Sequence, residues 1–513
     1  MIIDLANRGV DQAKTSEPLG LQQLHAVNVM ITTIDQLSWG EGLFKRASTN
    51  TRRKTERSVV TAMLVVLMAP VGAAHAEETA DSLTMVSYAQ PLNAKPLTMA
   101  DFEGPNGIAR LQEMQTQDAL SAVLPHEVTG PARAAAPHAA KQSAQPSAPS
   151  ETASQADGVG AAVITLPEPA HTMTLAECVR ELGTTQFYVK SRYAVCSGHQ
   201  FGQVWLRNGE AVGESHFDVV VIGTIPKNSR DMTATYHYTD FTASGINGAS
   251  GMGITTSASI PQTWPSTAAI LRGGNLPATK TWAELISGIT LTHTITALSG
   301  QAGQHGSARV ISAIYQPNIK LVAPPGWGSQ PFTGGNIFLL PPRWDEADYL
   351  PASTSGGAAA FSVLPTLKYS TAPSAPEREV ALHIQKAYAT PQLTLPPLAT
   401  KKLAGQVADE PLTRLYLDTE RRKKNRNRAV WNCVKFYGPN YADGGKQCDE
   451  FPFATTYQGS AGSDYDPLQA RSNFSVQAID GKSNEAAGTL LAQFYDLNRL
   501  IDGPDDGFLV KIT

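Results

Sequence analysis

The chain has 513 residues, more than one hydrophobic core usually serves, so we expect two or three domains. Its apolar content is ordinary and its net charge is only −4. No apolar run after residue 76 approaches the ~20 residues that a membrane-spanning helix needs, which argues against stable membrane insertion of that part of the chain.

The N-terminal segment, residues 1–76, has the pattern of a leader with a signal peptide. Basic residues at 52–57 precede an apolar run over 59–71, and small residues lead up to Ala76. This order predicts cleavage after Ala76 and a secreted product, extracellular or periplasmic. A membrane anchor is the alternative, but the run is short and contains Pro70. The residues ahead of it indicate either a later translation start or an extended leader.

Residues 77–165 are predicted to form a low-complexity, disordered linker. The stretch from residue 132 is dominated by Ala, Pro and Ser, so it cannot bury enough apolar surface to offset its ordering entropy. Residues 98–124 show a loose helical periodicity, to which we assign no chemistry.

Residues 166–372 predict a β-rich domain, sandwich-like or barrel-like, of unknown role. Runs rich in Val, Ile, Thr and Tyr, such as 216–222, 233–241, 289–298 and 309–322, are separated by Gly, Pro, Asn and Ser. Its histidines lack metal-ligand spacing and are interpreted as ordinary strand residues: His199, His216, His237, His293 and His305.

The four cysteines fall into two local pairs. Four cysteines allow three connectivities, and since export permits disulfides we predict the two local bonds, Cys178–Cys196 and Cys433–Cys448. A metal site would need a C-x-x-C pair or histidines at ligand spacing, and neither accompanies the second pair.

Residues 373–410 are predicted to hold a helix, over 377–389, and a proline-containing linker. The C-terminal domain, residues 411–513, opens with a stretch over 411–430 that predicts a helix. That helix would carry six clustered cations: Arg421, Arg422, Lys423, Lys424, Arg426 and Arg428. They suit phosphate groups, although a merely solvated basic helix is the alternative. The domain has 13 basic and 13 acidic residues, so a polyanion must be bound by a local patch.

Two adjacent acids follow Cys448. A disulfide closing the loop from Cys433 would contribute about 3 kcal/mol and hold these acids in place. Phe451 precedes a proline and is therefore biased to extended backbone, so Asp449 and Glu450 should point to opposite sides of the chain. One of them could serve a reaction while the other orients its surroundings.

The segment 448–454, Cys-Asp-Glu-Phe-Pro-Phe-Ala, resembles the Asp-Glu-aromatic-Pro centre of the NucA/NucB deoxyribonuclease family. Further segments agree in the same order: 415–426, 436–442, 456–461, 484–488 and 494–503. The resemblance runs from residue 377 or 411 to the end. It implies a small α+β nuclease domain, with DNA as the partner, and an endonuclease that hydrolyses phosphodiester bonds with little sequence preference.

Phosphodiester cleavage requires an activated water, a cation and donors that position the phosphate. The resemblance implies that Asp449 is the general base or an indirect metal orienter. Glu450 would be its partner or a metal ligand, and Asn484 a ligand or a ligand-orienting amide. The candidate phosphate contacts are Arg421, Arg422, Arg426 and Arg499. Oxygen donors suit Mg²⁺ or Mn²⁺, and the absence of histidine after His383 excludes a histidine base from this domain.

The sequence departs from the family pattern at three positions. Gln458 stands where members often have an acid, and Ser483 and Glu485 flank Asn484 where members have Asp and Arg. Glu485 is therefore a candidate substitute metal ligand.

Other functions stay open on the sequence alone. One alternative is a secreted protein that binds a surface or polymer and carries a degenerate, inactive nuclease domain. A glycosidase would need two carboxyls facing each other across a sugar, and no second acid is marked out. An active nuclease could serve nutrient scavenging, turnover of extracellular DNA, or a toxin role, for which an immunity protein would be the partner.

Overall fold

The computed structural model describes residues 81–92, 94–116, 164–183, 187–302, 309–350 and 356–513. The predicted signal peptide and its cleavage site lie outside the described residues, as does most of the predicted linker. The described residues belong to one compact unit. Within the described part of the chain, no helix is long and apolar enough to cross a membrane.

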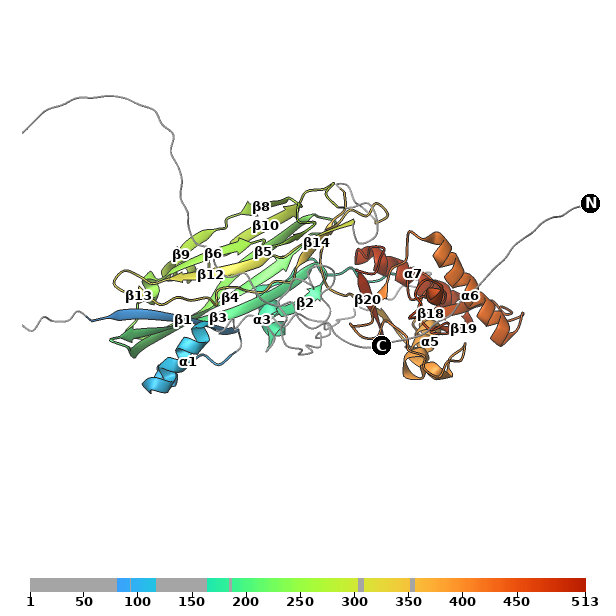
Figure 1. Ribbon diagram of the computed structural model, residues 1–513, viewed down its shortest axis with the longest axis horizontal. Helices are drawn as coiled ribbons and strands as arrows, with labels where there is room; N and C mark the ends of the chain where they lie inside the picture. The colour runs from blue at the N-terminus through green and yellow to red at the C-terminus, as the bar shows by residue number, and fades with distance from the viewer. Residues whose placement is uncertain (1–80, 93, 117–163, 184–186, 303–308, 351–355) are drawn as a thin grey trace, which may run out of the picture. The chain divides into compact units, whose positions relative to one another are not determined.

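The central region is β-rich, as the sequence predicts, and its largest sheet curls as a half-barrel (Figure 1). The sheet order is β13-β1-β3-β4-β5-β10-β8, with β2 added beside β3. Its strands are β1 (Leu83–Pro91), β2 (Phe187–Ser191), β3 (Ala194–Arg207), β4 (Glu210–Thr224), β5 (Asp231–Gly245), β8 (Ile270–Gly274), β10 (Leu291–Ala297) and β13 (Gly328–Ser329). Buried and half-buried residues alternate along β10, the pattern of a strand with one face in the core.

Two smaller sheets, β15-β14-β11-β7 and β12-β6-β9, complete the region. Their strands are β6 (Gly253–Ser259), β7 (Thr263–Trp264), β9 (Ala278–Thr281), β11 (Val310–Ala313), β12 (Gln316–Val322), β14 (Pro342–Asp345) and β15 (Ala359–Phe361). The predicted run 309–322 is thus two strands in different sheets, because periodicity does not mark a change of sheet partner. The three sheets share one apolar core, to which Trp205, Ile254 and Trp344 contribute.

Part of the predicted linker instead belongs to this region. β1 pairs antiparallel with β3 along its whole length and buries Met85 and Tyr88. The 3-10 turn η1 (Met99–Phe102) and helix α1 (Gly104–Thr116) follow, and Phe102 and Leu111 pack in the cluster that contains Tyr88. The linker prediction is wrong here because the low-complexity composition of the surrounding stretch obscures a short run that can bury apolar side chains.

Short helices cover parts of the β-rich region. α3 (Leu175–Leu182) is joined to β3 by the disulfide Cys178–Cys196, whose Cα atoms lie 6.1 Å apart. The one-turn helix α4 (Trp282–Leu285) begins with a capping box made by Thr281 and Glu284. The separation of Cys178 and Cys196 shows that the first predicted cysteine pair is at bonding distance.

The C-terminal region combines two small sheets with three longer helices. The sheets have the orders β16-β20-β17 and β18-β19. The elements are β16 (Thr366–Tyr369), α5 (Arg378–Ala389), β17 (Leu412–Thr413), α6 (Thr419–Tyr437), β18 (Lys446–Phe451), β19 (Ser475–Asp480), α7 (Gly481–Leu497) and β20 (Gly507–Ile512). One apolar cluster joins β16, α5, β18, α7 and β20.

The predicted helix over 411–430 begins later than expected. Leu412 and Thr413 pair with β20, and helix α6 begins at Thr419. Asp418 is the N-cap, and its side chain accepts a hydrogen bond from the backbone N–H of Arg421 at 2.8 Å. The unbroken composition of 411–430 does not reveal this boundary, which a side-chain cap sets. The helix predicted over 377–389 is confirmed as α5.

Candidate active site

The strand β18 presents its two acids to opposite neighbours, as the sequence predicts. Asp449 contacts His383 of α5, whereas Glu450 contacts Arg426 of α6. Side chains alternate along a strand, so Cys448 shares the α6 side with Glu450, and Gln447 shares the other side with Asp449.

Glu450 and Arg426 form a charge pair at the edge of the buried interior. The Glu450 side chain is 9% exposed, and Arg426 is 41% exposed. Arg426 Nη1 donates to Glu450 Oε2 and, at 2.6 Å, to the carbonyl oxygen of Cys448. Burial raises the pKa of Glu450 to about 7 and the adjacent Asp449 adds to the rise, while Arg426 opposes it. Such a carboxyl can exchange a proton near neutral pH.

The second disulfide fixes the helix that carries Arg426 to the strand that carries Glu450. Cys433 of α6 bonds Cys448 of β18, with Cα atoms 6.0 Å apart. Both predicted cysteine pairs are therefore at bonding distance. Asn425 adds to this fixation, because its Nδ2 donates to the carbonyl of Ala454 at 2.9 Å and its Oδ1 accepts from the backbone N–H of Ala461 at 2.9 Å. The helix, the strand and the loop that follows the strand are thus tied together.

On the opposite side of β18, three polar side chains form a buried chain of hydrogen bonds. Asp449 Oδ2 lies 2.5 Å from His383 Nδ1, and His383 Nε2 lies 2.7 Å from Ser475 Oγ. His383 is 1% exposed, Asp449 5% and Ser475 fully buried. The arrangement holds Asp449 in one position away from solvent.

The absence of histidine after His383 excludes a histidine general base within 411–513, and a histidine from outside those residues contacts Asp449. His383 lies outside the predicted domain 411–513, but α5 packs against α7, β18 and β19. The available signal was His383 itself, which stands in the buried stripe of an amphipathic helix beside Val380, Ile384 and Ala387. A polar residue in such a stripe needs a buried partner.

Asn484 and Glu485 lie near the start of helix α7, and the structure does not place them beside Glu450. Asn484 Nδ2 donates to Gln447 Oε1 at 2.8 Å, and Gln447 Nε2 donates to Glu485 Oε1 at 2.9 Å. Gln447 points to the side of β18 opposite Glu450, so the sheet separates the expected ligand set. The prediction that Glu450, Asn484 and Glu485 form one ligand set is wrong. The sequence does not show on which side of β18 the helix α7 packs.

On the α6 side the carboxylate beside Arg426 is that of Glu450, an oxygen donor of the kind that a hard cation takes. No group of three or more His, Cys, Asp or Glu side chains arranged for a metal occurs in the described ranges. Mg²⁺, however, commonly keeps several waters and takes only one or two carboxylates plus substrate phosphate oxygens. Glu450 fits that requirement.

The predicted phosphate contacts Arg421 and Arg422 lie against aromatic rings. The Arg421 guanidinium carbon is 4.8 Å from the ring centre of Tyr457 and 4.2 Å from that of Tyr465. Its Nη2 also donates to the carbonyl of Tyr457 at 2.7 Å. The Arg422 guanidinium carbon is 5.4 Å from the ring centre of Tyr416. Arg421 is therefore largely engaged in packing, and Arg422 is half-buried.

Arg499 is not a phosphate contact in this structure. Its Nε and Nη2 donate to the two carboxylate oxygens of Asp345 at 2.7 and 2.8 Å, and both side chains are almost fully buried. The backbone at Arg499, two residues after the end of α7, is left-handed (φ 47°), and the side chain reaches Asp345 of β14. The prediction is wrong because a buried bidentate pair leaves this guanidinium inaccessible.

Gln458, the departure from the family pattern, is an anchor for neighbouring backbone. Its Oε1 accepts from the backbone N–H of Thr413 at 3.0 Å, and its Nε2 donates to Thr413 Oγ1 at 3.1 Å. These bonds attach the 456–461 loop to β17.

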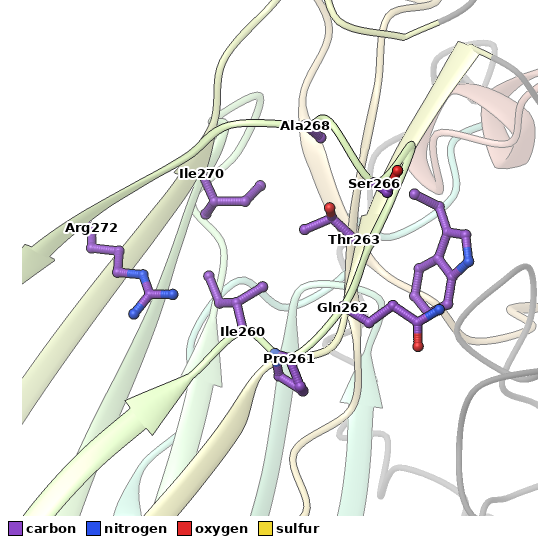
Figure 2. Close-up of a pocket in the computed structure, with 9 residues that line it drawn as sticks. Ile260, Pro261, Gln262, Thr263, Ser266, Ala268, Ile270 and Arg272 are labelled. Atoms are coloured by element: carbon purple, nitrogen blue, oxygen red, sulfur yellow. The ribbon is translucent and has the colours of Figure 1, made fainter. Parts of the chain in front are cut away.

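An open hollow of about 520 Å³ lies in the β-rich region (Figure 2). Ile260, Ile270 and Arg272 line one part of it, and Gln262 and Thr263 another. It holds no acid or nucleophile arranged for chemistry, so the C-terminal region carries the stronger candidate site.

The C-terminal region thus has a disulfide-braced strand on which a buried carboxylate with a pKa near neutrality meets a half-exposed arginine. This chemistry suits a hydrolase that acts on phosphate esters. Residues 405–510 match the family model Deoxyribonuclease NucA/NucB, so the C-terminal region of the chain is a NucA/NucB region. At the level of the family this supports nuclease activity with DNA as the substrate. No curated protein and no solved structure matches the chain.

Proposed function

We propose that the chain is an exported, metal-dependent endodeoxyribonuclease with little sequence preference, and that its C-terminal region is a small α+β nuclease domain. The observation that carries the proposal is the pair of Glu450 and Arg426, fixed by a disulfide within the matched NucA/NucB region.

In this proposal Glu450 serves the reaction and Asp449 orients its surroundings. A carboxyl with a pKa of about 7 suits a group that takes a proton from the attacking water near neutral pH. Arg426 has five N–H donors, and those not bound to Glu450 and Cys448 can position a phosphate oxygen. Asp449 is bound to His383 and fixes β18 from the side opposite Glu450.

Mg²⁺ or Mn²⁺, held through water beside Glu450 and by the substrate phosphate, would stabilise the charge that develops on the phosphate oxygens. Asn484 and Glu485 lie on the far side of β18 and take no part in this site.

Plasmid nicking by the chain from residue 77 onward, with its disulfides formed, tests the proposal. The longer chain is needed because β16 pairs with β20, and Asp345 pairs with Arg499. We expect relaxed and then linear plasmid with Mg²⁺ or Mn²⁺ and none with EDTA. Glu450→Gln should lower the rate by roughly 10²- to 10⁴-fold, the range for loss of a general base.

Glu485→Gln is the matched control, since Glu485 is exposed and lies on the other side of the strand. It should nick at the wild-type rate. Full activity of Glu450→Gln would show that Glu450 is not part of the active site. No cleavage by a folded, oxidised wild type would favour the inactive binding protein.

A further inference from the structure

Helix α6 carries an exposed ridge of cations and one aromatic ring on a face away from Glu450. Lys424, Arg428, Trp431 and Lys435 are spaced four, three and four residues apart, which places them within about 60° of one another around the helix. They span about 16 Å along its axis. Arg426 lies on the other flank of the buried face, so this ridge is separate from the candidate active site.

Exposed apolar side chains lie beside the cations of the ridge. Trp431 is 60% exposed, and the ammonium of Lys435 is 5.0 Å from its ring centre. Tyr465 is 40% exposed, with the ammonium of Lys424 5.2 Å from its ring centre. Leu468, three residues further along the chain, is 93% exposed.

The loop that carries Tyr465 is fixed to the ridge. Arg428 Nη2 donates to Asp464 Oδ2 at 2.6 Å, which pairs the charge of Asp464 and attaches the segment that carries Tyr465 to the helix. Among the described residues, neither Lys424 nor Lys435 has a carboxylate partner. The surface therefore combines two unpaired cations with two exposed aromatic rings.

We propose that this surface, made of Lys424, Trp431, Lys435 and Tyr465, binds single-stranded DNA. The inference deepens the proposed function by naming a substrate form, and it rests on that function. Exposed rings next to cations fit a single strand, because unpaired bases stack on the rings while phosphates meet the cations. In a duplex the base faces are already stacked, so the rings gain nothing and only the cations contribute.

Binding without cleavage tests this proposal independently of catalysis. The full chain from residue 77 is titrated, in EDTA, into a fluorescently labelled oligothymidylate of about 12 nucleotides and into a duplex of equal length, and anisotropy is measured. Trp431→Ala should weaken oligothymidylate binding by roughly 5- to 150-fold, the equivalent of one lost base stack. Duplex binding should change less than twofold, and Trp431→Phe should retain most of the single-strand affinity.

Val434→Ala is the matched control, because Val434 is 40% exposed on the same helix but has no ring. It should bind like the wild type. Lys435→Ala should weaken both forms and reduce the salt dependence of both. Unfolding curves for each variant exclude loss of the fold.

The proposal is overturned if Trp431→Ala weakens both forms equally or neither. If the protein binds phosphatidylglycerol vesicles through Trp431 and does not bind the oligonucleotide, the surface is a membrane-binding one, and this result would also overturn the proposal. Binding is measured in EDTA without cleavage, and plasmid nicking by the wild type tests the nuclease assignment, so a failure of this proposal is separable from a failure of that assignment.

Discussion

At the scale of single residues, the Glu450 carboxyl makes stability depend on pH. Its ordinary pKa is 4.5, and burial raises the pKa to about 7 in the folded chain. The folded state therefore binds the proton more tightly than the unfolded state does. The resulting stabilisation is complete below pH 4.5 and is lost as the pH rises toward 7, at a cost of up to about 3 kcal/mol.

Glu450→Gln removes this titration, so the variant should gain stability relative to the wild type between pH 5 and pH 8. Melting temperatures measured in EDTA at both pH values check the prediction, with Glu485→Gln as the control for general effects of pH. A difference between wild type and Glu450→Gln that stays constant with pH would show that Glu450 is ionised in the folded chain throughout.

The residues of the site could be predicted from the sequence only in part. The opposed directions of Asp449 and Glu450 follow from strand geometry, and the structure confirms them. The sequence could not distinguish the role of Arg426 from that of Arg499. Arg426 pairs with Glu450 and Arg499 pairs with Asp345, and nothing in the neighbouring residues shows whether an arginine binds a carboxylate or a phosphate. His383 lies 66 residues before Asp449, and no local spacing connects them.

At the scale of elements, the disulfide Cys433–Cys448 should stabilise the candidate site itself. It closes a loop with a sequence separation of 15 residues, for which the chain-entropy estimate is about 3 kcal/mol. Replacing both cysteines by alanine should lower the free energy of unfolding by about that amount and lower the nicking rate, because α6 loses its link to β18. Urea unfolding and plasmid nicking measure the two effects.

The other disulfide provides the matched comparison. Cys178–Cys196 has a sequence separation of 18 and joins α3 to β3 in the β-rich region. Its removal should cost a similar free energy but leave the nicking rate of the folded protein unchanged. If both double variants lose nicking equally, the disulfide Cys433–Cys448 does not act through the geometry of Glu450 and Arg426.

Elements were predictable where one periodicity dominates, as in β10 and α5. They were mispredicted where a boundary depends on a partner distant in sequence. β17 exists because Leu412 and Thr413 pair with β20, about 95 residues later, and composition favours a helix there instead. β1 likewise depends on β3.

At the scale of the whole molecule, buried ion pairs connect the β-rich region to the segment after α7. Arg499 bonds both carboxylate oxygens of Asp345, and Asp506 accepts from Arg192 at 2.7 Å and from Arg343 at 2.9 Å. These residues are nearly fully buried, with Asp345 itself 0% exposed. Because β16 also pairs with β20, the segment 411–513 completes its structure with residues that precede it in the chain.

Asp345→Ala should therefore destabilise both regions. It leaves the Arg499 guanidinium buried without its carboxylate, which costs about 3 to 5 kcal/mol in comparable pairs. We expect calorimetry to show a lower melting temperature and, where the wild type unfolds in one transition, two separated transitions in the variant. Asp348→Ala is the control, since Asp348 pairs with Arg309 in the same stretch but is 80% exposed, so its loss should change melting little. An unchanged melting profile for Asp345→Ala would mean that this pair does not couple the two regions, and the ion pairs of Asp506 with Arg192 and Arg343 would then be the connections to test.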